Sequence, residues 1–272
     1  AIESTGERRL CLSGGVALNS VTNGRILKEL MPEQLFIQPA STDDGAALGA
    51  ALFAFYSESD QEPVYIEDTV YLGPEYSNRE IEMYLKRNKL KYKWSKNFEK
   101  IVAKKIADGK IIAWFQGRSE FGPRALGNRS ILVDPRDPTM KEKLNSKVKF
   151  RESFRPFAPS VLEECASEYF DCNEPSPHML LTYNVKKQHQ KVLPAITHVD
   201  GTARIQTVSR KQNGRYYDLL KEFGKLTGIP VLLNTSLNIK GEPIVNTPQE
   251  AINSFLGSGI DVLAIGNFIV KK

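Results

Sequence analysis

The chain has 272 residues, of which 41% are hydrophobic and 25% are charged, and its formal net charge is +5. This is an ordinary globular composition, with enough length for one large or two medium domains. The longest apolar run, from Gly45 to Tyr56, is shorter than the roughly 20 residues that a membrane helix needs, and the chain opens without a signal-peptide pattern. Cys11, Cys165 and Cys172 lack CxxC spacing, which argues against a disulfide framework or a structural zinc site. We therefore expect a soluble, cytoplasmic protein.

Residues 1–70 predict a first unit in which strands and helices alternate. Its expected elements are a strand over 9–12, a glycine turn at 13–15, a helix over 18–30, a strand over 35–37, and a helix that polar N-cap residues begin at 41–45 and that ends near 56. This order is typical of a layered α/β unit. The polar residues 57–63 are predicted to be a linker, so we place the boundary near residue 70.

Residues 71–272 continue the α/β alternation. Helices are expected over 78–88, 97–108, 216–226 and 248–256, and strands over 110–115, 130–133, 158–162, 179–185, 203–208, 229–233 and 262–265. Both hairpin-like and helical connections separate these short strands. The pattern therefore predicts a mixed, twisted sheet rather than a purely parallel one.

Residues 118–155, here called the basic segment, contain ten Lys and Arg residues and five Asp and Glu residues. The excess equals the net charge of the whole chain, so the rest of the sequence is balanced. A local cationic excess indicates an anionic partner such as a nucleotide, an acyl phosphate or a nucleic-acid backbone. A solvated basic face is the alternative.

Two stretches of the basic segment combine charge with turn-forming residues. In residues 117–130, glycines would let the backbone approach an oxyanion, and Arg124 and Arg129 add planar, permanently charged forks. In residues 147–159, an extended backbone would place Lys149, Arg151 and Arg155 on one face. The aromatic residues of this second stretch, at 150, 154 and 157, are expected to be anchored in the core.

A third stretch, residues 232–238, reads as a buried strand that ends in hydroxyl and amide groups suited to phosphate or sugar, with a plain Asx turn as the alternative. Motifs for nucleophilic or metal catalysis are absent: the chain has no Walker lysine loop, GxGxxG, GxSxG or HExxH. His178, His189 and His198 lie in one late segment without ligand spacing, which is more typical of surface or loop residues. The sequence therefore predicts a site that positions anions.

These motifs together resemble a known family. Lys149-x-Arg151 and Ser236-x-Asn238 are similar to the KxR and SxN signatures of YrdC-like domains. Residues 122–130, 154–159 and 233–236 resemble the C-terminal domain of NodU/CmcH-type O-carbamoyltransferases, and residues 13–19 and 42–45 resemble loops of the family's actin-like ATPase domain. The family's N-terminal half, which supplies metal-binding histidines and much of the acceptor pocket, has no counterpart here. The chain is therefore expected to be a C-terminal fragment.

The resemblance implies an α/β protein in which residues 1–70 are the C-terminal piece of an actin-like ATPase (ASKHA) domain and residues 71–272 a YrdC-like domain. It implies a carbamoyltransferase that makes carbamoyl adenylate from carbamoyl phosphate and ATP and passes the carbamoyl group to an acceptor hydroxyl. ATP with Mg²⁺ would be a substrate. The divalent metal of the full-length family, such as iron, is expected to be absent from this fragment.

The resemblance also assigns residues. The catalytic residues would be Arg124, Lys149 and Arg155; the other substrate and ATP contacts Arg129, Arg151, Arg204, Asn234, Ser236 and Asn238; the adenylate contacts in the first unit Gly14, Gly15 and Asn19; and the metal ligand Asp43, with Asp44 second. Two alternatives stay open: a threonylcarbamoyl adenylate synthase-like enzyme, and a module that binds single-stranded RNA. Neither a membrane nor a nucleic-acid partner is expected, and the sequence does not define the acceptor or the oligomeric state.

Overall fold

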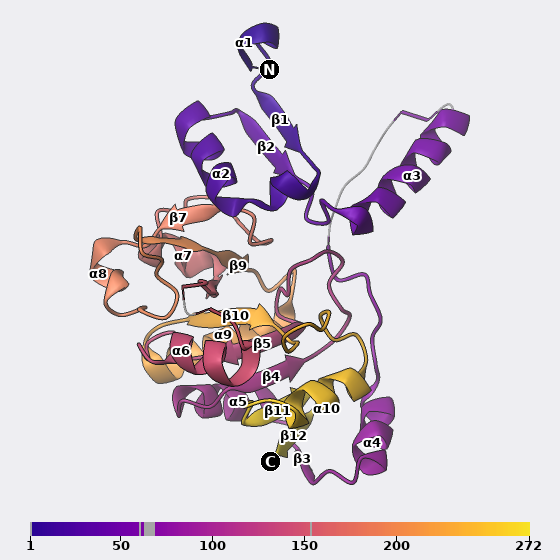
Figure 1. The fold of residues 1–272 in the computed structure, drawn as a ribbon, viewed down its shortest axis with the longest axis vertical. Coiled ribbons are helices and arrows are strands. Elements are labelled where there is room, and N and C mark those ends of the chain that lie inside the picture. The colour runs from indigo at the N-terminus through magenta and orange to yellow at the C-terminus, as the bar shows by residue number, and fades with distance from the viewer. Residues whose placement is uncertain (1, 60, 63–68, 153) are drawn as a thin grey trace.

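The structure is a computed structural model that describes residues 2–59, 61–62, 69–152 and 154–272. Figure 1 shows a small N-terminal unit, in indigo, that sits on one end of a larger unit built around a sheet. The N-terminal unit consists of α1 (Ile2–Thr5), β1 (Arg9–Leu12), η1 (Gly15–Leu18), α2 (Ser20–Arg25), η2 (Ile26–Leu30), β2 (Gln34–Ile37) and α3 (Asp43–Glu58). Strands β1 and β2 pair in parallel, and the helical turns between them form the crossover.

Helix α3 extends away from the rest of the N-terminal unit and from the larger unit in Figure 1. It forms as the sequence predicts, because small apolar residues such as alanine favour a helix. None of its described side chains is buried, and Phe53 and Phe55 are 77% and 51% exposed. A helix this apolar and this exposed needs a further covering surface.

The larger unit contains helices α4 (Asn78–Arg87), α5 (Phe98–Ala107), α6 (Met140–Leu144), α7 (Ala166–Tyr169), α8 (Lys187–Gln190), α9 (Gly214–Thr227) and α10 (Pro248–Leu256), with short helical turns η3 (Asn145–Lys149) and η4 (Glu163–Cys165). Its strands are β3 (Tyr92–Trp94), β4 (Ile112–Phe115), β5 (Arg129–Val133), β6 (Ala158–Leu162), β7 (Thr182–Asn184), β8 (Thr202–Arg204), β9 (Gln206–Val208), β10 (Val231–Ser236), β11 (Val262–Ile265) and β12 (Phe268–Lys271). Eight of them form one sheet in the order β3-β12-β11-β4-β5-β10-β6-β9. Two of its pairings, β4 with β11 and β6 with β9, are parallel and the others antiparallel, which confirms the predicted mixed sheet and the α/β class.

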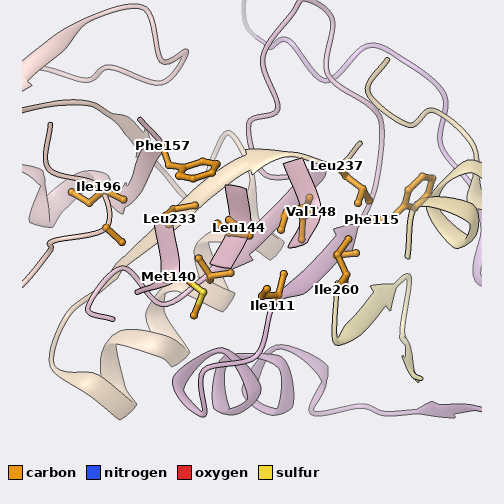
Figure 2. Packing of buried hydrophobic residues seen from close by; sticks show 14 of the residues in the cluster. Ile111, Phe115, Met140, Leu144, Val148, Phe157, Ile196, Leu233, Leu237 and Ile260 are labelled. Carbon is orange, nitrogen blue, oxygen red and sulfur yellow. The ribbon is translucent and has the colours of Figure 1, made fainter. Parts of the chain in front are cut away.

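Both faces of the sheet are covered by helices. On β4, Ala113 and Phe115 contribute to one core cluster while Ile112 and Trp114 contribute to the other, as the period of two in a strand requires. Helices α4, α6 and α10 supply the first cluster, part of which Figure 2 shows around Met140, Leu144 and Val148, and α5 and α9 supply the second. Strands β4 (IAWF) and β11 (VLAI) are therefore apolar along their whole length.

The predicted strand over 203–208 divides at Ile205. Its first half, β8, pairs with β7 in a separate two-stranded sheet, whereas its second half, β9, joins the edge of the large sheet. This division places Arg204 at the point where the chain leaves one sheet for the other. The N-terminal unit contacts the segment that leads into β7. Asn23 donates from Nδ2 to the carbonyl oxygen of Leu180 at 2.9 Å, and Ala17, Ile37 and Leu180 form a small buried cluster.

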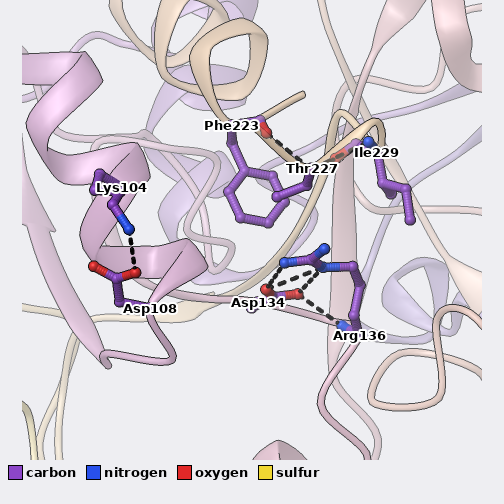
Figure 3. Close-up of polar contacts among 7 residues, drawn as sticks. All are labelled: Lys104, Asp108, Asp134, Arg136, Phe223, Thr227 and Ile229. Atoms are coloured by element: carbon purple, nitrogen blue, oxygen red, sulfur yellow. Dashed lines mark hydrogen bonds and ion pairs between the residues drawn. The ribbon is translucent and has the colours of Figure 1, made fainter. Parts of the chain in front are cut away.

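Several ion pairs and hydrogen bonds fix the ends of elements away from this junction (Figure 3). Arg136, a member of the basic segment, pairs with Asp134 through a 2.6 Å contact, and Lys104 pairs with Asp108 at 2.6 Å. At the end of α9, Thr227 Oγ1 donates to the carbonyl oxygen of Phe223 at 2.8 Å. Part of the basic segment is thus engaged in local structure.

Candidate functional site

A cavity of about 260 Å³ lies between the N-terminal unit and the larger unit. Its lining residues are Ser20, Val21, Arg124, Arg151, Arg155, Pro156, Phe157, His198 and Arg204. Four of them are arginines and none is an acid. A cavity with this lining favours an anion that carries several oxygen atoms.

The four arginines reach the cavity from separate parts of the fold. Arg124 lies in the loop between β4 and β5, and Arg204 ends β8. Arg151 and Arg155 follow η3, where the chain turns toward β6. Helix α2 closes the cavity through Ser20 and Val21, and Arg124 Nη2 donates to the carbonyl oxygen of Leu18 at 3.2 Å. The site therefore depends on both units.

The arginines of the cavity lack ion-pair partners in the part of the chain that the structure describes. The Nε atoms of Arg124 and Arg204 are buried and have no hydrogen-bond partner there. Burial, together with the charges of Arg124 and Arg151, lowers the pKa of Arg204 to about 9. A bound oxyanion would supply the acceptors and the negative charge that the cavity lacks.

Lys149 joins the KxR and SxN pairs. Its Nζ donates to Ser236 O at 2.6 Å, to Asn238 Oδ1 at 2.7 Å, and to Ser236 Oγ and Asn238 O at 3.2 Å. The fold thus brings together two motifs that are separated by more than eighty residues in the chain. Burial and the nearby charge of Arg151 lower the pKa of Lys149 to about 7, so the ammonium group is held by oxygens but is easily deprotonated.

The structure corrects the expected conformation of residues 147–159. The backbone is not extended: α6 continues into η3, and Phe150 at its end has φ 46°, in the left-handed region. Arg151 and Arg155 therefore line the cavity while Lys149 turns toward β10. Phe157 is buried as expected, but Phe150 and Phe154 are 47% and 76% exposed, so the prediction that all three are core anchors was wrong.

Arg129 and Asn234 do not line this cavity. Arg129 is fully buried, and its guanidinium donates to carbonyl oxygens, including Gln116 O at 2.6 Å and Pro74 O at 3.0 Å. Asn234 Nδ2 donates to Ser160 Oγ at 3.1 Å and to Gln206 Oε1 at 3.0 Å inside the sheet. Both side chains support the loop and strands that carry the site.

Glu120 is a support that the sequence did not reveal. It is partly buried, and desolvation of its carboxyl group raises its pKa. Its Oε1 accepts hydrogen bonds from the backbone N–H groups of Leu126 at 2.7 Å and Asn128 at 2.8 Å. These bonds hold the loop on which Arg124 stands. The only sequence signal was an acid within a basic, glycine-rich loop.

Gly127 makes the same loop sensitive to side-chain volume. Its φ is 105°, and a Cβ atom there would lie 2.2 Å from Cδ1 of Tyr216. We expect Gly127→Ala to lower the free energy of unfolding by about 3 kcal/mol, because strain and overlap add. Urea denaturation measures this, with Gly109→Ala as the matched control. Gly109 has φ 77° and no atom within 4 Å of its Cβ position, so its loss should be only about 1 kcal/mol. Equal losses would contradict the overlap argument.

The predicted contacts of the N-terminal unit lie in its loops. A Cβ atom on Gly15 would come within 3.9 Å of Thr42, so the loops at 13–15 and 42–45 are neighbours. Asn19 caps α2, with Oδ1 accepting from the backbone N–H of Thr22 at 3.1 Å, and Gly14 has φ 90°. From this unit, Ser20 and Val21 line the cavity, whereas Gly14, Gly15 and Asn19 are not among its lining residues.

The predicted metal ligands, Asp43 and Asp44, begin α3. Asp44 Oδ1 accepts from Thr42 Oγ1 at 2.7 Å, and no group of three His, Cys, Asp or Glu side chains that could hold a metal ion occurs among the described residues. Asp43 and Asp44 alone do not fit a complete metal site.

His198 is the lining residue that the sequence argument passed over. Its pattern was typical of a loop histidine, and it does lie in the turn before β8. Because this turn folds back beside Arg204, the imidazole lines the arginine cavity. The only sequence signal was that His198 lies six positions before Arg204, a predicted site residue, and this signal is not specific.

Comparison with known proteins gives the class of this chain. The family model "Carbamoyltransferase C-terminus" matches residues 103–272, and the model "Carbamoyltransferase N-terminus" matches residues 1–52. The chain belongs to the carbamoyltransferase family.

Three relatives are similar in sequence over most or nearly all of the chain. They are the nodulation protein NolO of Bradyrhizobium diazoefficiens (47% identity, 99% of this chain and 50% of the relative), the uncharacterized protein sll1178 of Synechocystis (45%, 99% and 48%), and the nodulation protein U of Sinorhizobium fredii (39%, 87% and 40%). The chain thus spans about half the length of the first two relatives. Full-length HypF, solved in a phosphate- and nucleotide-bound form, aligns with 61% of this chain and 21% of its own at a TM-score of 0.40 and 20% identity.

Proposed function

We propose that this chain forms carbamoyl adenylate from carbamoyl phosphate and ATP. The observation that carries the proposal is the cavity lined by four arginines and no acid, with Lys149 close enough to one of them, Arg151, to feel its charge. Two phosphorylated substrates bring several negative charges, which matches this excess. Membership of the carbamoyltransferase family supports the carbamoyl group as the unit transferred, and it disfavours a threonylcarbamoyl adenylate synthase.

The chemistry requires positioning rather than a protein nucleophile. Water would hydrolyse carbamoyl phosphate to carbamate and inorganic phosphate, and a carbamate oxygen would then attack the α-phosphorus of ATP as pyrophosphate leaves. Arg124, Arg155 and Arg204 would neutralise the phosphate oxygens of both substrates, and Lys149 would bind a further oxygen. Mg²⁺ would enter with ATP. Ser236 and Asn238 would hold Lys149 in place, as they do through its Nζ.

The second step, transfer to an acceptor hydroxyl, would take place in the N-terminal unit. Because the relatives are longer, we propose that the rest of this unit covers the exposed side chains of α3 and completes the acceptor site. No part of the step is assigned to a metal, since Asp43 and Asp44 do not form a metal site with other described residues. None of the described helices has the length and apolarity needed to cross a bilayer.

The test is release of pyrophosphate from ATP by the purified chain. We expect release that requires carbamoyl phosphate and needs no acceptor. Omitting carbamoyl phosphate, or replacing ATP by its α,β-methylene analogue, serves as the control. Pyrophosphate release that is independent of carbamoyl phosphate would contradict the proposal.

The pKa of Lys149 predicts a pH dependence of this reaction. The protonated form binds phosphate, and the pKa is lowered to about 7, so activity is present below this pH and is lost as the pH rises through it. We expect kcat/KM for carbamoyl phosphate to fall above about pH 7. In Lys149→Arg the fall should move to much higher pH, because a guanidinium stays charged. An unchanged pH profile in Lys149→Arg would assign the titration to another group.

A second candidate, binding of single-stranded RNA, gains one observation from the structure. Phe150 and Phe154 are exposed beside basic residues and could stack on bases. Fluorescence titration at rising salt separates the two functions. RNA binding through the backbone would weaken steeply with salt, whereas turnover of ATP and carbamoyl phosphate would not.

A further inference from the structure

A chain of hydrogen bonds fixes the proton on the imidazole of His198. Asp200 Oδ1 lies 2.7 Å from Thr202 Oγ1, which lies 3.1 Å from His198 Nδ1. The turn is held by its backbone as well, since the N–H of His198 donates to Thr202 O at 2.8 Å. The three side chains therefore form a line that starts at a carboxylate and ends at a residue of the arginine cavity.

The direction of each bond follows from the chemistry of the groups. Partial burial acts to raise the pKa of Asp200, but hydrogen bonds from Thr202 lower it overall, so Asp200 is an anion and can only accept. The single hydroxyl proton of Thr202 must then point at Asp200. Its oxygen can only accept from His198, which places a proton on Nδ1.

His198 is also neutral when the cavity is empty. Burial lowers its pKa, and the charges of Arg204 and Lys141 act in the same direction, against the opposite effect of Asp200. A neutral imidazole with its proton on Nδ1 has an unshared electron pair on Nε2. This Nε2 is buried and has no partner among the described residues. The guanidinium groups that line the cavity together with His198 can only donate, so Nε2 differs from them in that it needs a donor.

We propose that His198 Nε2 accepts a hydrogen bond from the amide N–H of the carbamoyl group, and so selects carbamoyl phosphate over acyl phosphates that carry a methyl group in its place. The arginines recognise only oxygen atoms, which all acyl phosphates share. The NH₂ group is the donor that distinguishes carbamoyl phosphate from acetyl phosphate of nearly the same shape. The inference rests on the proposed function, because it concerns the substrate of the same cavity.

Calorimetric binding of carbamoyl phosphate and of acetyl phosphate tests the selection. In the unmodified chain we expect carbamoyl phosphate to bind at least about tenfold more tightly, because a methyl group leaves the buried acceptor unpaired. His198→Leu should lose this preference by weakening carbamoyl phosphate alone. His198→Gln, which returns an acceptor, should restore a large part of it. Equal weakening of both ligands in His198→Leu, or a preference that persists in it, would overturn the proposal.

Nitrogen NMR of the labelled histidine tests the proton assignment without any ligand. We expect a protonated Nδ1 and an unprotonated Nε2 for His198 at pH 7, and loss of this tautomer preference in Thr202→Val. A proton on Nε2 would overturn the proposal. If neither phosphate binds to a folded chain, the proposed function itself fails. Binding of carbamoyl phosphate without discrimination overturns only the role of His198.

Discussion

Replacing Arg204 by glutamine is expected to abolish formation of carbamoyl adenylate while making the protein more stable. Arg204 lines the arginine cavity, its buried Nε has no hydrogen-bond partner among the described residues, and its pKa is lowered to about 9. Loss of a group that binds phosphate oxygens in a buried site should reduce pyrophosphate release by about a hundredfold or more. Activity should fall while the free energy of unfolding rises, a trade-off that is typical of functional sites.

The gain in stability follows from the sign of the pKa shift. The unfolded chain keeps this guanidinium protonated up to its ordinary pKa, so the folded state bears an electrostatic penalty that is complete below about pH 9 and fades above it. Removing the charge should raise the free energy of unfolding by about 2 kcal/mol at pH 7, since part of the penalty is offset by packing of the aliphatic stem. Urea denaturation and the pyrophosphate assay measure the two effects.

Arg210→Gln is the matched control for Arg204→Gln. Arg210 is exposed and paired with Asp218 at 2.5 Å, so its replacement should leave pyrophosphate release unchanged and alter stability by at most about 0.5 kcal/mol. If Arg204→Gln kept full activity, the cavity would not be the adenylation site. If it lost activity through unfolding, Arg204 would be structural.

The sequence was informative about the fold where periodicity is strong. Apolar spacing located α5, α9 and α10 and the buried strands β4 and β11, because helices and strands that face a core repeat every 3.6 or two residues. It missed β3 and β12, which lie at or beside one edge of the sheet, and α6, whose charged residues masked its two buried positions. It also read one strand over 203–208, since no local signal marks a chain that passes from one sheet to another.

The candidate site was predictable in its motifs but not in its geometry. The resemblance to the KxR and SxN signatures of YrdC-like domains grouped Lys149, Ser236 and Asn238, and the structure brings them into contact. Their roles in catalysis stay predictions. The sequence could not show that Phe150 takes a left-handed conformation and that Lys149 turns toward β10, because this depends on the distant contacts of Lys149 with Ser236 and Asn238. Nor could it separate Arg124, which lines the cavity, from Arg129, which binds carbonyl groups, since both lie in the same glycine-rich stretch.

Arg129 is the buried arginine whose loss should harm the fold most. It is 0% exposed, its guanidinium carbon lies 3.7 Å from the centre of the Phe115 ring, and its donors hold the carbonyl oxygens of Gln116, Gly117 and Pro74. Burial lowers its pKa to about 10 against the opposing charge of Glu120, so it remains charged at pH 7. We expect Arg129→Met to lower the free energy of unfolding by about 3–5 kcal/mol, because buried carbonyls lose their donors.

Two variants sharpen this prediction. Arg129→Lys should restore little of the stability, because one ammonium group cannot span Pro74 O and Gln116 O as the planar fork does. Arg118→Met is the control, since Arg118 is exposed and its guanidinium donates to Leu72 O at 3.0 Å. If Arg129→Met were as stable as the control but released no pyrophosphate, Arg129 would belong with the substrate contacts, as its motif predicts. The carbonyl groups it binds would then be positioning it for that role, and the loop at 117–130 would act as one unit with the cavity.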